Sequence, residues 1–235
     1  MQSSTISSRS TSARTGSAPE LIGIFQRHRV WDYSKQNAIA LNSLGVKVDQ
    51  IVPIGYVKEL TRIQHAPKRD IDVLFFGSMN SRRKQIIDRM RAAGLQVISA
   101  FGVYGKQRDE LISRAKLVLN VHYYDAKVLE IVRISYLLAN RCAVLSEYSS
   151  NPADDTSLIG GVAFTDYHHL VQRARELIAS PAERKRLARQ GFKIMSGRNA
   201  GNYLKTALTQ DSSAYIAIED TSTAQSTTSV PKGFR

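Results

Sequence analysis

From Asp70 onward the sequence alternates short apolar runs with longer segments of helical period. In the longer segments, apolar residues recur on one helical face, as Ile86, Ile87 and Met90 do. Such alternation is typical of βαβ units, which form a parallel sheet covered by helices. It predicts an α/β fold with a Rossmann-like, doubly wound parallel sheet of about five strands. The predicted strands are residues 71–76, 95–101, 117–121, 142–146 and 162–164.

Helix signals lie between and after these runs. Gly94 ends one predicted helix, Asp166 is placed to cap another, and Ser180-Pro181 begins a third with Glu183 in its first turn. The predicted helices are residues 81–93, 106–115, 126–140, a segment that begins after Asp166, 180–190 and 192–208.

The segments before Asp70 and the two ends of the chain do not show this regular alternation. Residues 31–44 have a helical pattern that stops at Gly45, and residues 48–53 form a short predicted strand. We interpret residues 21–56 as the remnant of a larger domain with its connector, and residues 57–209 as the main domain. Ser- and Thr-rich composition predicts disordered tails over residues 1–20 and 210–235.

Composition limits the classes of protein. A chain of 235 residues with 43% hydrophobic residues can bury one sizeable core. It has neither the apolar run of a signal peptide nor one that spans a bilayer, which predicts a cytoplasmic protein. The single Cys142 is predicted to be a buried apolar residue.

A formal net charge of +13 suits nucleic acid, an anionic membrane face or a phosphate-bearing ligand. The basic residues are scattered over several predicted helices without interleaved aromatic residues, which argues against specific nucleic-acid binding. Peripheral membrane contact stays open.

The turn after the first predicted strand of the main domain is suited to an anion. Gly77 lets a ligand approach the backbone, Ser78 and Asn80 donate or cap, and Arg83 lies in the first turn of the next helix. The alternative is an ordinary capped turn with solvated basic residues, and a single glycine does not decide between the two.

A second group of polar residues follows the strand at residues 117–121. Lys127, Glu130 and Arg133 recur every third residue on a predicted helix that is otherwise apolar. They either pair with one another or line a cleft at the carboxyl ends of the strands. In a cleft, Lys127 and Arg133 would meet diphosphate charge, and Glu130 and Glu147 would accept from ribose or sugar hydroxyls.

His122, at the mouth of the same strand, is placed either to stack on a base or to pack in the core. We find no metal-ligand cluster, no nucleophile triad and no Walker loop in the sequence, and we assign no catalytic residue.

In their order along the chain, these motifs resemble bacterial family-1-type glycosyltransferases of the GT-B fold. The motifs are VWDYSKQN, VPIGY, DVLFFGSMNSRR, AKLVLNVHYYD and EIVRISYLLANRCAVLSE. The resemblance covers residues 21–208 and implies the C-terminal, donor-binding domain, with Gly55 and Tyr56 in the interdomain connector.

The resemblance implies that residues 57–209 bind a nucleotide-diphosphate sugar and that transfer uses neither metal nor cofactor. It places Gly77 near the diphosphate, and Glu130 and Arg133 near ribose and sugar. The paired glutamates of many retaining members are absent, which leaves the stereochemistry open, and the N-terminal acceptor domain has no counterpart beyond residues 31–44. The acceptor would then be bound by a separate domain or protein; the alternative is a non-catalytic nucleotide-binding or protein-interaction module.

Overall fold

The computed structural model describes residues 18–124 and 126–209. The tails predicted for residues 1–20 and 210–235 lie outside the described residues, except that Ala18 to Glu20 begin helix α1 (Ala18–Arg27). The chain divides into two compact units, one of residues 53–205 and a smaller one that includes residues 18–52. Each unit is described by itself.

The larger unit is built on a five-stranded parallel sheet, as predicted. The strand order is β4-β3-β5-β6-β7, so the first strand of the unit pairs with both the second and the third. The strands are β3 (Ile71–Phe76), β4 (Val97–Ala100), β5 (Ala115–Asn120), β6 (Val144–Glu147) and β7 (Ala163–Thr165).

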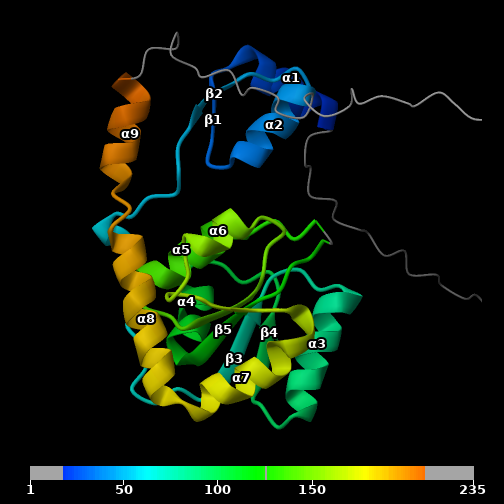
Figure 1. The fold of residues 1–235 in the computed structure, drawn as a ribbon, viewed down its shortest axis with the longest axis vertical. Coiled ribbons are helices and arrows are strands. Elements are labelled where there is room, and N and C mark those ends of the chain that lie inside the picture. The colour runs from blue at the N-terminus through cyan, green and yellow to red at the C-terminus, as the bar shows by residue number, and fades with distance from the viewer. Residues whose placement is uncertain (1–17, 125, 210–235) are drawn as a thin grey trace, which may run out of the picture. The chain divides into compact units, whose positions relative to one another are not determined.

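Helices cover both faces of this sheet, which makes the fold doubly wound (Figure 1). Helices α3 (Ser81–Ala92) and α7 (Leu170–Ala179) pack on one face through Ile86, Met90 and Leu177. Helices α4 (Gly105–Arg114) and α5 (Ile131–Ala139) pack on the other, and α8 (Pro181–Ser196) contributes to both hydrophobic clusters. The remaining elements of this unit are η1 (Lys58–Leu60), α6 (Pro152–Thr156), η2 (Tyr167–His169) and the greater part of α9 (Ala200–Thr209).

Local signals set several helix ends as predicted. Asn80 caps α3, since its Oδ1 accepts from the Arg83 amide at 2.9 Å. Gly94 follows that helix with φ +84°, a left-handed conformation that glycine adopts without strain. Ser180 caps α8 through the Glu183 amide at 3.3 Å, directly before Pro181.

The predicted helix at residues 126–140 is wrong over its first turn and a half, because α5 begins only at Ile131. Lys127 has φ +48°, and its carbonyl accepts from the Ser150 amide at 3.0 Å. The backbone of Ala126 likewise accepts from Ser150 Oγ at 2.7 Å. These bonds hold the segment in a loop, so Lys127, Glu130 and Arg133 do not form one helical row.

Two further helix predictions are corrected. Helix α8 continues past Gln190 to Ser196, because Gly191 and Met195 are buried on its inner face. Asp166 precedes η2 but makes no capping hydrogen bond with its side chain.

The smaller unit contains β1 (Val30–Asp32), α2 (Lys35–Ser43) and β2 (Val48–Ile51), with the two strands parallel. The prediction of one helix over residues 31–44 is therefore wrong at its start. Asp32 accepts from the Ser34 amide at 2.7 Å, and Ser34 then caps α2, so the chain turns before the helix begins. Among the described residues, no helix is long and apolar enough to cross a membrane.

Candidate functional site

The strand order places a topological switch point between β3 and β5. The chain leaves β3 for α3 on one face of the sheet and leaves β5 for α5 on the other. In open α/β sheets, the crevice outside the carboxyl ends of two such strands is where ligands bind. The two motifs singled out in the sequence, after residues 76 and 120, follow these two strands.

The turn after β3 brings bare backbone to this position. Gly77 has φ +143°, and its amide donates to the carbonyl of Ala100 at 2.9 Å. A Cβ atom on Gly77 would lie 2.9 Å from Nη2 of Arg133. Because Gly77 has no side chain, the guanidinium of Arg133 has room to lie close to the turn.

Arg83 joins the two motifs. Its guanidinium donates to the carbonyls of Val121 at 2.8 Å and Ser78 at 2.9 Å, and to Glu130 Oε1 at 2.5 Å. Only 3% of Arg83 is exposed. The alternative of a capped turn with solvated basic residues is correct about the Asn80 cap and wrong about Arg83.

Glu130 and Arg133 lie at the start of α5. Nη1 of Arg133 is 2.5 Å from Oε2 of Glu130 and 3.1 Å from Oδ1 of Asn120. The two residues therefore do pair with one another, as one alternative held, and they also lie at the carboxyl end of β5. Nη2 of Arg133 makes no hydrogen bond to any described residue. Burial lowers the pKa of this guanidinium, and the charge of Glu130 opposes that effect.

Glu147, at the end of β6, is 1% exposed and forms a bidentate ion pair with Arg82. The Lys127 Nζ is 3.5 Å from Oε1, and the His122 amide donates weakly to Oε2 at 3.4 Å. Burial raises the pKa of Glu147, but the hydrogen bond and charge of Arg82 outweigh it, so the pKa lies below its ordinary value. A buried, paired carboxylate has little capacity left for sugar hydroxyls, so the structure disfavours the role predicted for Glu147.

The aromatic segment after β5 is only partly open. His122 is 2% exposed, in agreement with the packing alternative. Tyr124 is 73% exposed, and the Tyr123 ring centroid lies 5.2 Å from Cζ of Arg83. Tyr124, whose ring also makes an edge contact with Tyr123 at 4.7 Å between centroids, is therefore the most exposed aromatic residue of this segment.

Three residues outside the predicted site set belong to the same network: Arg82, Asn120 and Tyr167. Tyr167 donates to the carbonyl of Arg82 at 2.8 Å, and the Arg82 guanidinium lies 4.1 Å from its ring centroid. Asn120 is fully buried and donates to Ser146 Oγ at 3.0 Å. An Asn at the end of an apolar run is visible in the sequence. It could have indicated a polar site, because a buried amide needs hydrogen-bond partners.

The predicted residues are thus brought together in one network, to which Arg82 also belongs. Arg82, Arg83, Lys127 and Arg133 face two carboxylates, Glu130 and Glu147, which leaves a formal charge of +2. Such a cluster suits an anion with two charges. Over the two described ranges, no group of three or more His, Cys, Asp and Glu residues is placed to hold a metal ion.

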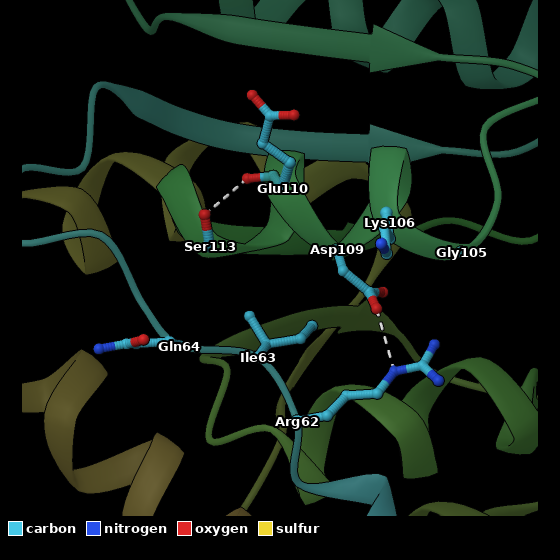
Figure 2. A pocket seen from close by; sticks show the side chains of 8 residues that line it. All are labelled: Arg62, Ile63, Gln64, Gly105, Lys106, Asp109, Glu110 and Ser113. Carbon is cyan, nitrogen blue, oxygen red and sulfur yellow. Dashed lines mark hydrogen bonds and ion pairs between the residues drawn. The ribbon is translucent and has the colours of Figure 1, made fainter.

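A separate pocket of about 510 Å³ lies between α4 and residues 62–64 (Figure 2). Figure 2 shows the side chains of Arg62 and Asp109 pointing toward each other. The distance between Nε of Arg62 and Oδ2 of Asp109 is 3.0 Å. Tyr136 also donates to Asp109, at 2.7 Å. Because its main charges neutralise one another and none of the predicted site residues lines it, we do not assign the ligand to this pocket.

Comparisons with known proteins bear on the fold. A scan against models of protein families finds no match. The uncharacterised protein L138 of Acanthamoeba polyphaga mimivirus is 33% identical over 132 residues, which cover 53% of this chain and 15% of that protein. The chain therefore matches a small part of this relative.

Solved structures give a broader match. HepE of Anabaena, in complex with UDP and glucose, has a TM-score of 0.59 at 12% identity, over 81% of this chain and 65% of that one. TarM has a TM-score of 0.55 at 10% identity, over 81% and 45%. The fold matches that of GT-B glycosyltransferases.

At this level of identity the likeness shows the fold alone. The α/β prediction with its parallel sheet of five strands is confirmed. The bacterial origin implied by the resemblance gains no support, because the relative reported above is viral.

Proposed function

We propose that residues 53–205 form the donor-binding site of a glycosyltransferase that takes a nucleotide-diphosphate sugar. The observation that carries the proposal is the close approach of the Arg133 guanidinium to Gly77 at the switch point of the sheet. The Nη2 atom of Arg133, which has no hydrogen-bond partner among the described residues, lies beside Gly77, which has no side chain. A phosphate over this turn would accept from Nη2 and offset the cost of burying that charge.

The same geometry suits the chemistry of transfer. As the bond between sugar and diphosphate breaks, negative charge grows on the leaving diphosphate. Arg133 and Lys127 would stabilise that charge from fixed positions. Such electrostatic stabilisation is usually the largest single contribution to the rate enhancement. Arg83 and Glu130 would act as positioning residues, because their mutual ion pair holds Arg133 against the turn.

The acceptor and any catalytic base would come from another domain or protein, since both substrates must be held in reacting geometry. The resemblance further leads us to propose transfer without a metal ion. Under this proposal, activity with a supplied acceptor is unchanged by EDTA.

Calorimetric titration with UDP, GDP and their sugar conjugates, with ADP for comparison, tests donor binding. We expect selective binding of one diphosphate, and Arg133→Gln should weaken it by about tenfold or more. Arg175→Gln removes one exposed cation from α7 and should leave the affinity within about twofold. Failure of every nucleotide to bind, or equal loss in both variants, would contradict the assignment.

A second candidate is a nucleotide-binding module without transferase activity. The observation in its favour is that both oxygens of Glu130, and both of Glu147, are already engaged by arginines. A donor sugar would have to share these carboxylates. This candidate predicts diphosphate binding with neither donor hydrolysis nor transfer; measured turnover of a UDP-sugar or GDP-sugar excludes it.

A further inference from the structure

A basic cavity lies at the opposite end of the sheet from the candidate donor site. Its volume is about 440 Å³. Arg69 precedes β3, Lys116 is the second residue of β5, and Ala143 directly precedes β6, so the cavity lies at the amino ends of these strands. A six-residue strand such as β3 separates it from the carboxyl ends by roughly 20 Å.

Six cations line this cavity, and they come from four separate parts of the chain: Arg69, Lys116, Arg141, Arg184, Lys185 and Arg189. Helix α8 supplies three of them, because positions 184, 185 and 189 lie on one helical face. In the described part of the chain, only Lys116 has a carboxylate partner, Asp72 Oδ1 at 2.6 Å. The cavity therefore concentrates positive charge that Asp72, through Lys116 and Arg184, offsets only in part.

Uncharged groups hold three of the guanidinium groups in place. Arg184 donates to the carbonyls of Leu177 and Ile178 at 2.5 and 2.6 Å, at the carboxyl end of α7. Arg141 lies 3.7 Å from the ring centroid of Phe192, and Arg69 donates to the carbonyl of Ala115 at 3.4 Å. These partners orient the side chains and leave their charges available to a ligand.

The electrostatics of the surrounding groups agree with this picture. Burial, and then the charge of Arg69, lower the pKa of His65 at the wall of the cavity. The same two causes lower the pKa of Arg184. The pocket with Arg62 and Asp109 differs, because there the opposite charges pair directly.

We propose that this cavity is a second ligand site, which binds a small molecule with two or more phosphate groups. Arginine is suited to phosphate through its planar set of donors, and several guanidinium groups around one cavity suit more than one phosphate. The volume is in the range of small-molecule sites, which favours a compact ligand over a lipid surface. The site is independent of the proposed donor site, and either can fail alone.

Titration with inorganic tripolyphosphate at physiological ionic strength tests the proposal on the full chain. Lys185→Gln with Arg189→Gln removes two exposed cations from the cavity, and it should weaken binding by about tenfold or more. The matched control, Arg175→Gln with Arg186→Gln, removes the same charge from α7 and α8 outside the cavity and should change the affinity by less than about twofold. Equal losses in the two double variants would mean non-specific attraction and overturn the proposal.

Two further experiments distinguish binding in this cavity from binding at the donor site and from binding to lipid. If Arg133→Gln abolishes tripolyphosphate binding while the cavity variant keeps it, the anion occupies the donor site and the proposal is wrong. Vesicles of phosphatidylcholine with phosphatidic acid test a lipid source. Sedimentation with these vesicles that depends on Lys185 and Arg189, without tripolyphosphate binding, would replace the small-molecule site by a membrane contact.

Discussion

Arg83 and Glu130 are 47 positions apart in the sequence, and Nη2 of the first lies 2.5 Å from Oε1 of the second. The side chain of Arg83 is 4% exposed and that of Glu130 is 25% exposed. This contact connects the turn after β3 to the start of α5, across the switch point of the sheet. It thereby holds Arg133, the second partner of Glu130, beside Gly77.

Glu130→Ala should destabilise the fold, because it leaves the buried Arg83 without its counter-ion. We expect a loss of about 3 kcal/mol in the free energy of unfolding, measured by urea titration. Glu110→Ala removes an exposed glutamate from α4 and should cost less than about 0.5 kcal/mol. A Glu130 variant as stable as the Glu110 variant would show that the ion pair does not hold the two motifs together.

The ion pair of Glu147 makes stability depend on pH. Its pKa in the fold lies below the ordinary value of 4.5, so the pair stabilises the protein above that value. The stabilisation is lost as the pH falls through the lowered pKa. The difference in free energy of unfolding between the native chain and Glu147→Gln should thus be largest near pH 7 and shrink in acid; a difference that does not vary with pH would contradict this linkage.

Gly191 is required for the close packing of α8. A Cβ atom there would lie 2.6 Å from Cδ2 of Leu138 on α5 and 3.0 Å from the carbonyl of Gly161. Gly191→Ala should therefore lower the free energy of unfolding by about 1–3 kcal/mol. Gly197→Ala is the control, because its Cβ would meet only ordinary contacts from 3.5 Å and should change stability by a few tenths of a kcal/mol. Equal stabilities of the two variants would refute the packing argument.

The thiol of Cys142 should be unreactive in the folded protein. It is 3% exposed, and burial raises its pKa to about 12, so the reactive thiolate is scarce at pH 8. Because it is the single cysteine of the chain, alkylation by iodoacetamide followed by mass spectrometry reports on it alone. We expect labelling in urea and none in buffer. Labelling of the folded chain at the rate seen in urea would show that the thiol is accessible.

Local pattern determined much of the architecture. The apolar runs and helical periods identified all five strands of the larger unit, because strand and helix periods are properties of short windows. The capping of α3 by Asn80 and its stop at Gly94 are local in the same way. The motifs also indicated the two ends of the site, since the residues after parallel strands come together at one edge.

Only the tertiary structure decided how the charges pair. The sequence pattern placed Lys127, Glu130 and Arg133 on one helix, whereas hydrogen bonds from Ser150, more than twenty residues away, hold Lys127 in a loop. It offered Glu147 as a hydroxyl acceptor, and the fold buried it against Arg82. Arg184 and Lys185 line one cavity together with Arg69 and Arg141, which lie far from them in the sequence. The physical reason is that ion pairs and cavities depend on distances between segments far apart in the chain, which no short window of sequence contains.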